Sequence, residues 1–432
     1  MNYTDAVAFV ESTLKFGSRP GLESTYRLME RLGNPQDSLR VIHVAGTNGK
    51  GSTSTFMKQI LMEAGYTVGI FTSPSLHEFT ERIVVNNEEI GKDDFAAVAG
   101  EVKEAIDGIV ADGFEANTEF EIFTAMAYLQ FQRKGVDFAI MEVGMGGRLD
   151  ATNVIKKPVV TVITPIALDH TDWLGNTLYE IAGEKGGIIK YKCPVVLHPQ
   201  AEEAEKRLQE IALDHEAPML VAPVDMIEYD EEDLSGTSFR LGREQYRVGM
   251  LGRHQPANAT VAMTAVLLLE EEEGITIPQS ALKFGLLKAR WAGRLEKLSE
   301  SPLILIDGAH NPHGAEKLAE SVKTLGGGKR VNALIGMLGD KDVDAVLDTM
   351  LPVIHTAVVT EPESDRKLPA KDLFEKVKAR GVEAEMIEDM NGALERALLN
   401  TSKDDVLLVF GSFYLIGKLR KRIMDDPSIQ LG

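Results

Sequence analysis

Short apolar runs rich in β-branched residues alternate with longer helical patterns along most of this chain, and no other feature constrains the fold as strongly. In the first two thirds, five runs predict buried strands: "RVIHVAG", "YTVGIFTSP", "DFAIMEVG", "PVVTVITP" and "CPVVLHP". Segments such as "EFEIFTAMAYLQFQRKG" predict the helices between them. Strands that alternate with helices are typical of a mostly parallel sheet, so the sequence predicts an α/β fold.

A second alternation begins after "WAGRLEKLSESP". Its strand-like runs are "LILID", "RVNALIGM", "IHTAVVT", "VEAEMIE" and "DVLLVFG". We therefore expect a boundary near Glu296, with a large nucleotide-binding domain over residues 1–295 and a smaller Rossmann-like α/β domain over residues 296–432. A chain of 432 residues, of which 44% are hydrophobic, is long enough for two such cores. A cleft between two domains is the default place for an active site.

Charge, cysteine content and hydropathy exclude several classes of protein. The formal net charge of −20 argues against nucleic-acid binding, because clustered lysine and arginine residues hold a phosphate backbone. The single cysteine, Cys193, excludes an internal disulfide and a cysteine-based metal site. No apolar run approaches the ~20 residues that span a bilayer, and the first residues do not resemble a signal peptide. We expect a cytoplasmic protein without nucleic-acid or membrane partners.

A glycine-broken turn follows the first strand, in "VIHVAGTNGKGSTSTFM". The common phosphate-binding pattern GxxxxGK[ST] requires a glycine where this chain has Val44, and a hydroxyl where it has Gly51. Even so, Gly46, Gly49 and Gly51 allow the backbone to turn its N–H groups inward. Lys50 can reach phosphate oxygens, and the next helix presents its positive end there. The turn predicts a nucleotide phosphate site; a glycine-rich connection with a solvated lysine is the alternative.

Further polar residues follow other predicted strands, where ligands of open parallel sheets bind. Ser73 could present a hydroxyl to a metal, and Glu142 ends the pattern "DFAIME". A carboxylate beside phosphates is a good Mg²⁺ ligand, because Mg²⁺ prefers oxygen donors; a solvated acid is the alternative. His170 follows another strand, and Lys185 lies on the helical stretch after it. A hydrogen-bonded structural histidine and a helix-end lysine are the plainer interpretations.

In the C-terminal half, Asp307, His310 and Asn311 crowd the turn after "LILID", where a helix-capping role is the alternative to a binding role.

Several motifs together closely resemble the folylpolyglutamate and dihydrofolate synthases, a family within the Mur ligase superfamily. They are "HVAGTNGKGS", "TSPSLHEFTERI", "EVGMGGRLDATNV", "LDHTDWLGNTLYEIAGEKGGIIK", "GRHQPANA", "WAGRLE" and "DGAHNPHG". The resemblance covers nearly the whole chain in order. It implies that a folate γ-carboxyl takes the γ-phosphoryl group of ATP and that L-glutamate then attacks the acyl phosphate. Such a reaction requires positioning and positive charge more than a nucleophilic side chain.

The resemblance also implies roles for individual residues. ATP would be held by Thr47, Asn48, Gly49, Lys50, Gly51, Ser52, Asn258, Arg294, Asp307 and His310. A first Mg²⁺ would be bound by Ser73 and Glu142, and a second by Glu142, His170 and a carbamylated Lys185. The folate or pterin would contact Phe120, Asp150 and Ala151 beside a mobile loop from Pro74 to Arg82, and Ser412 with Tyr414 would make glutamate or domain contacts. Lys50, Lys185 and His310 are the expected catalytic residues, in a monomer whose domains close over ATP.

Two rival functions stay open at this point. A Mur ligase that extends a cell-wall precursor would share the cradle, the acid and the lysine, although the long folate-type motifs disfavour it. A nucleotide-binding switch would hydrolyse ATP without regard to folate or glutamate. Within the folate enzymes, we expect extension of reduced folates and also use of dihydropteroate.

Overall fold

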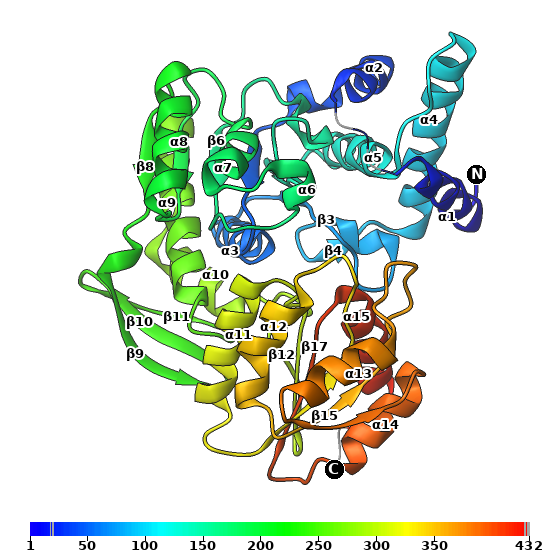
Figure 1. The fold of residues 1–432 in the computed structure, drawn as a ribbon. Coiled ribbons are helices and arrows are strands. Elements are labelled where there is room, and N and C mark those ends of the chain that lie inside the picture. Colours follow the sequence, from blue (N-terminus) through cyan, green and yellow to red (C-terminus); the bar gives the residue numbers. More distant parts are fainter. Residues whose placement is uncertain (18, 20, 427–428, 430–432) are drawn as a thin grey trace. The chain divides into compact units, whose positions relative to one another are not determined.

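The computed structural model describes residues 1–17, 19, 21–426 and 429, and the chain divides into two compact units (Figure 1). The first comprises Met1–Ile227 and Ala257–Lys288, and the second comprises Glu228–Pro256 and Ala289–Gly432. Each unit is therefore assembled from two separate stretches of the chain. The α/β class is confirmed, whereas the domain boundary near Glu296 stays a prediction.

The first unit is built on an eight-stranded sheet. Its strands are β1 (Val41–Ala45), β2 (Val68–Phe71), β3 (Ile83–Val85), β4 (Glu88–Glu89), β5 (Phe138–Glu142), β6 (Val160–Ile163), β7 (Val195–Leu197) and β8 (Met219–Val221). The order across the sheet is β4-β3-β2-β5-β1-β6-β7-β8. The strands from β2 to β8 in this order run parallel, and β3 and β4 are antiparallel at one edge. All five residues of β1 are buried, as its apolar sequence predicts.

Helices connect these strands and cover the sheet. They are α1 (Tyr3–Ser12), α2 (Glu23–Arg31), α3 (Lys50–Glu63), α4 (Lys92–Ala111), α5 (Glu119–Lys134), α6 (Thr171–Leu174), α7 (Leu178–Gly186), α8 (Glu202–Asp214), α9 (Gln255–Glu273) and α10 (Gln279–Lys288). The predicted helix in "EFEIFTAMAYLQFQRKG" is α5. It begins with a capping box between Thr118 and Glu121 and ends at Gly135, which has a left-handed backbone.

Two glycines of the first unit allow close packing, one between a strand and a helix and one between two helices. The ring of Phe131 on α5 lies where a side chain on Gly69 would be, with a Cβ there only 2.5 Å from the ring. Helix α10 packs against α3 in the same way, because a Cβ on Gly285 would lie 2.6 Å from the Cα of Ile60. At the end of these two helices, Lys288 donates to both carboxylate oxygens of Glu63 at 2.9 Å. Glycine at these two positions therefore lets helix and strand, or helix and helix, pack without a gap.

The second unit contains two sheets. The larger one has the order β12-β13-β17-β14-β15-β16, in which only β12 is antiparallel. Its strands are β12 (Glu296–Glu300), β13 (Leu303–Asp307), β14 (Val331–Ile335), β15 (Thr356–Val359), β16 (Glu383–Met386) and β17 (Val406–Phe410). Its helices are α11 (Pro312–Leu325), α12 (Val343–Met350), α13 (Ala370–Ala379), α14 (Met390–Leu399) and α15 (Phe413–Asp425).

A smaller antiparallel sheet in this unit has the order β11-β10-β9. It consists of β9 (Ile227–Asp233), β10 (Gly236–Leu241) and β11 (Glu244–Val248). This sheet could not be predicted from apolar runs, because β9 has the sequence "IEYDEED" and is largely exposed, so it lacks the apolar run of a buried strand. The ten apolar runs that predicted strands all form strands.

Two further observations concern the single cysteine and the possibility of membrane-spanning helices. Cys193 is buried, with 1% of its surface exposed. Among the helices of the described residues, none is long and apolar enough to cross a membrane.

Candidate functional site

Parallel strands bring the predicted phosphate and metal residues to one edge of the first sheet. Strand β5 lies between β2 and β1, and β6 lies on the other side of β1. In the register, Val44 pairs with Glu142, and Phe71 pairs with Met141, so these strands end level with one another. The glycine turn after β1, Glu142 at the end of β5 and Ser73 after β2 therefore share the edge at which such sheets bind ligands.

The glycine turn has a backbone conformation that disfavours any residue with a Cβ. Gly49 has a φ of 86°, and a Cβ there would lie 2.7 Å from Oδ1 of Asn258. Asn258, which is 4% exposed, thus lies against the turn, and its nucleotide role stays a prediction. On the other side, Thr47 donates its backbone N–H to the carbonyl of Pro165 at 2.8 Å. Its hydroxyl exchanges two 3.0 Å hydrogen bonds with the backbone of Ala167.

Gly49→Ala provides a direct test of this turn. A residue with a Cβ in the left-handed region costs about 1–2 kcal/mol, and here the Cβ also displaces Asn258. We expect the affinity for ADP, measured by calorimetry, to fall roughly tenfold or more. Gly65→Ala is the matched control, because Gly65 has a similar φ of 94° and no atom within 4 Å of the added Cβ. If Gly49→Ala bound ADP no worse than Gly65→Ala, this turn would not be the phosphate site.

Two lysine side chains converge on one carbonyl oxygen of the turn. Nζ of Lys50 donates to the carbonyls of Gly46 at 3.0 Å and Thr47 at 3.3 Å. Nζ of Lys185 donates to the same Gly46 oxygen at 2.9 Å, and Lys185 is only 5% exposed. Lys185 is therefore buried at the turn, where a solvated helix-end lysine would not be.

Burial is the main reason that the pKa of Lys185 falls from its ordinary value to about 7, and the charge of Lys50 lowers it further. The carboxylates of Asp169 and Asp150 act in the opposite direction. A large share of the Lys185 amines is therefore neutral near pH 7, and a neutral amine is nucleophilic.

His170 lies less deeply than the other predicted metal residues. It precedes α6 with a left-handed backbone, and its side chain is 40% exposed. Its Nε2 is 4.0 Å from Oδ1 of Asp169. Within the described residues, no three His, Cys, Asp or Glu side chains are grouped so that they could hold a metal ion. The donor set at the sheet edge is a nearly buried Glu142 carboxylate and the Ser73 hydroxyl, and oxygen donors of this kind suit a Mg²⁺ that also binds phosphates.

The Asp150 carboxylate accepts four hydrogen bonds from groups inside the protein. Its Oδ1 accepts from the backbone N–H of Thr152 at 3.0 Å and from the hydroxyl of Thr152 at 2.6 Å. Its Oδ2 accepts from the backbone N–H groups of Gly144 and Met145, both at 3.0 Å. An ionised carboxylate has about four acceptor positions, so these bonds use all of them. Burial raises the pKa of Asp150, while the four hydrogen bonds oppose that rise.

His43, which is not among the predicted site residues, extends this network into the sheet. Because the Thr152 hydroxyl donates to Asp150, it accepts from Nε2 of His43, 2.9 Å away. The proton of the neutral ring is therefore on Nε2. Complete burial, with a smaller effect of Lys190, lowers the pKa of His43 to about 3. A histidine inside the apolar run "RVIHVAG" was the available signal for a buried polar contact.

Phe120, the predicted pterin contact, lies against the loop that Asp150 holds. A Cβ on Gly144 would be 2.6 Å from the Phe120 ring, and the ring centroid is 5.7 Å from that of Phe71. The predicted mobile loop is tied to the same helix, because Arg82 forms a 2.9 Å ion pair with Glu119. Only 11% and 17% of these two side chains are exposed. Ala151, 6% exposed, follows Asp150 directly.

In the second unit, Asp307 joins two loops. Its carboxylate accepts 2.7 Å hydrogen bonds from the backbone N–H groups of Leu295 and Ala309. Burial raises the pKa of Asp307, and the charge of Arg294 opposes this. The loop that carries Arg294 and the loop that carries His310 are therefore fixed to each other.

Two other predicted residues of this unit act as helix caps. The Asn311 side chain accepts from the N–H of Gly314 at 2.8 Å at the start of α11, which is the capping role left open above. The Ser412 hydroxyl accepts from Leu415 at 3.2 Å at the start of α15. Ser412 is 2% exposed, whereas its neighbour Tyr414 is 46% exposed.

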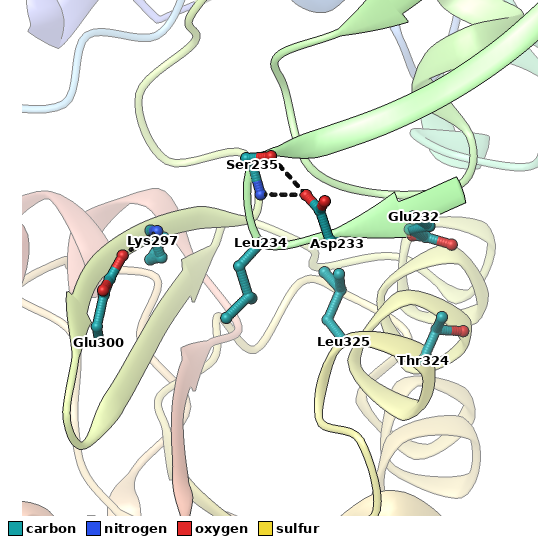
Figure 2. Close-up of a pocket in the computed structure, with 8 residues that line it drawn as sticks. All are labelled: Glu232, Asp233, Leu234, Ser235, Lys297, Glu300, Thr324 and Leu325. Atoms are coloured by element: carbon teal, nitrogen blue, oxygen red, sulfur yellow. Dashed lines mark hydrogen bonds and ion pairs between the residues drawn. The ribbon is translucent and has the colours of Figure 1, made fainter. Parts of the chain in front are cut away.

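A surface pocket of about 470 Å³ also lies in the second unit (Figure 2). Some of its charged residues are paired: Asp233 accepts from the N–H and the hydroxyl of Ser235, and Lys297 pairs with Glu300 at 2.6 Å. Both carboxylate oxygens of Glu232 are buried and have no hydrogen-bond partner among the described residues. None of the predicted site residues lines it. Its lining consists of Glu232, Asp233, Leu234, Ser235, Lys297, Glu300, Thr324 and Leu325.

Known proteins resemble this chain over almost all of its length. Residues 44–266 match the Mur ligase middle domain, and residues 293–413 match the Mur ligase, glutamate ligase domain. A dihydrofolate synthase/folylpolyglutamate synthase of Bacillus subtilis (strain 168) is 38% identical, over 98% of this chain and 99% of that protein. The enzyme of the same description from Escherichia coli (strain K12) is 32% identical, over 93% and 91%.

Solved structures agree with these sequence matches. Mycobacterium tuberculosis folylpolyglutamate synthase complexed with ADP superimposes with a TM-score of 0.89 at 30% identity, covering 98% of this chain and 100% of that one. E. coli FolC in complex with DHPP and ADP gives a TM-score of 0.86 at 32% identity, covering 98% of each chain.

Proposed function

This chain belongs to the folylpolyglutamate and dihydrofolate synthase family of Mur ligases, and from that premise we propose how its own residues carry out the reaction. Members of this family are ATP-dependent ligases that join glutamate to folates. The cell-wall ligase is not favoured, because the similar proteins that span nearly the whole chain are folate enzymes.

The turn after β1 binds the phosphates of ATP in this proposal. The observation that carries it is the convergence of the Lys50 and Lys185 amines on the Gly46 carbonyl, at the sheet edge that also carries Glu142. Lys50 and the N–H groups at the start of α3 make a local positive site in a protein whose net charge is −20. The N–H groups at the start of α3 and Lys50 would contact the phosphates. The other members of this set are Thr47, Asn48, Gly49, Gly51, Ser52 and Asn258.

Arg294, Asp307 and His310 are the proposed nucleotide contacts of the second unit. Of these, Asp307 acts through the backbone, because its carboxylate accepts hydrogen bonds from the N–H groups of Leu295 and Ala309 in the two loops. Arg294 and His310 are then the side chains that meet an anion.

Magnesium would be held by the oxygen donors at the same edge. Ser73 and Glu142 would bind one ion with the phosphates, and Glu142, His170 and a carbamylated Lys185 would bind a second. When bound, the metal neutralises charge that develops on the transferred phosphoryl group. Carbamylation requires a neutral amine, which adds to CO₂ to give a carbamate and one released proton. The pKa of about 7 for Lys185 supports this step.

The chemistry then depends on orientation. The cradle holds the γ-phosphoryl group in line with a folate carboxylate oxygen, which displaces ADP and leaves an acyl phosphate. The amine of L-glutamate attacks the acyl carbon, phosphate leaves, and the amide forms with loss of a proton. Fixed N–H groups and Lys50 lower the barrier of the first step by stabilising charge on the phosphoryl oxygens.

We assign the acceptor to the neighbourhood of Phe120. The Phe120 ring and Ala151 would contact the pterin. Because internal donors occupy all four acceptor positions of the Asp150 carboxylate, we assign its side chain to the shape of the site: it holds the backbone of Gly144 and Met145 against Phe120. Ser412, a helix cap, likewise supports the backbone before α15.

The second activity, with dihydropteroate as acceptor, is testable in one assay. Purified protein is incubated with ATP, L-glutamate and either dihydropteroate or tetrahydrofolate, and products are separated by chromatography. We expect amide formation with both acceptors, because the relatives from B. subtilis and E. coli are each named dihydrofolate synthase/folylpolyglutamate synthase and match more than nine tenths of this chain. Normal extension of tetrahydrofolate without any dihydrofolate would remove the dihydrofolate synthase activity. ADP release that needs neither acceptor nor glutamate would instead favour the nucleotide switch.

We also propose that the enzyme works as a monomer in the cytoplasm. A single buried thiol and an acidic surface suit that compartment.

A further inference from the structure

Phe413, the first residue of α15, touches two of the proposed nucleotide contacts. The guanidinium carbon of Arg294 lies 4.6 Å from the centroid of the Phe413 ring. The His310 ring is 5.9 Å away between centroids and meets the Phe413 ring edge-on, at 65°. One aromatic side chain therefore contacts a cation from the loop before β12 and an imidazole from the loop after β13.

The surrounding backbone is built around this ring. A Cβ on Gly308 would lie 2.6 Å from Phe413, so only glycine allows the ring to reach its place. Asp307 fixes the two loops through Leu295 and Ala309, but it orders backbone groups and not the side chains beyond them. Phe413 instead provides an aromatic surface that the side chains of Arg294 and His310 contact.

These contacts also determine the tautomer of His310 and the orientation of Arg294. Nδ1 of His310 lies 2.8 Å from the carbonyl of Gly308, which can only accept, so Nδ1 carries the proton and Nε2 has the lone pair in the neutral ring. The face of an aromatic ring attracts a guanidinium and limits its rotation. Arg294 and His310 are thereby held in fixed orientations in the same part of the second unit.

We propose that Phe413 is a positioning residue for nucleotide binding: it holds the Arg294 guanidinium and the His310 imidazole in the orientation that meets the anion. The proposal rests on the assignment of Arg294 and His310 as nucleotide contacts. Phe413 is half-buried and stands at a helix start, where a residue needed only for core packing would lie deeper.

The test replaces the ring while keeping its apolar bulk. In Phe413→Leu, the affinity for ADP, measured by calorimetry on the full chain, should fall roughly 3- to 30-fold, which is the range that a cation–π contact spans. Phe413→Tyr keeps the ring and should bind as the wild type does. Phe374→Leu is the matched control, because Phe374 is a partly buried ring of the same unit with Lys378 5.2 Å from its centroid, and it lies outside the site.

A double-mutant cycle with Arg294→Ala tests the positioning role of Phe413 separately from the assignment of Arg294 as a nucleotide contact. If Phe413 acts through Arg294, Phe413→Leu should cost clearly less affinity in the Arg294→Ala background than alone. Equal ADP affinity in Phe413→Leu and Phe374→Leu, or fully additive losses in the cycle, would overturn the positioning role. If Arg294→Ala itself bound ADP as tightly as the wild type, the underlying nucleotide assignment would fail instead. Thermal unfolding of each variant identifies any loss that comes from misfolding.

Discussion

Lys50→Ala abolishes ligation and leaves the fold intact: this is the largest effect that we expect from a single substitution. In the structure, Nζ of Lys50 donates to two carbonyls of its own turn, those of Gly46 and Thr47, and the side chain is part-buried at the surface of the sheet edge. Alanine suits the first position of α3, since it is the strongest helix former. The loss therefore falls on the phosphates, where a missing charge at a phosphoryl-transfer site costs about a thousandfold or more in rate.

The measurement is ATP-dependent incorporation of labelled glutamate into tetrahydrofolate, together with circular dichroism to confirm folding. Lys103→Ala is a suitable control, because Lys103 is an exposed helix lysine that pairs with Asp107 four residues later. It should keep near-normal turnover. If Lys50→Ala did so as well, the nucleotide assignment of this turn would be wrong.

The second large effect concerns Lys185. We expect Lys185→Ala to lose most ligase activity, to keep ADP binding, and to recover part of the activity when acetate or propionate is added. The buried amine lies beside Lys50 at the Gly46 carbonyl, so as an ammonium it would repel a nearby Mg²⁺. A carbamate reverses the sign of the group, and a small carboxylate in the space left by alanine would supply similar oxygens.

A readout independent of activity is available for this prediction. Wild-type protein in ¹³C-labelled bicarbonate should show a carbamate signal by NMR that is absent from Lys185→Ala and unchanged in Lys103→Ala. Activity that survives the substitution would exclude a second metal held by Lys185. Activity that is lost, with no rescue and no carbamate signal in the wild type, would show that the unmodified amine is the functional form.

The strands of both main sheets could be predicted because parallel strands are buried on both faces and therefore appear as continuous apolar runs. The same reasoning could not find β9, in which five acidic residues lie on an exposed antiparallel ribbon. Its partners β10 and β11 are recognised only when the three strands are seen paired.

In the candidate site, too, some features could be predicted from the sequence and others could not. The glycine turn and Glu142 could be predicted because each directly follows or ends an apolar run. The hydrogen bonds of Asp150 could not, since they depend on backbone N–H groups of Gly144 and Met145 that only the folded loop brings to its carboxylate. Phe413 resembles an ordinary helix residue in "GSFYLIG". Its proposed role depends on contact with Arg294, which lies more than a hundred positions earlier in the sequence.

The packing of α10 on α3 has a consequence for how the protein is made. Helix α3 begins at Lys50, yet one of its faces is covered by a helix that ends at Lys288, and the Lys288–Glu63 ion pair joins residues 225 positions apart. On the ribosome, the helix that carries the proposed phosphate-binding lysine must therefore wait for more than half of the chain to emerge before its neighbour arrives. Until then the surface around Ile60 is open to other apolar segments. Chains that stop short of α10 should accordingly aggregate or be degraded, even though every residue of the glycine turn is already present.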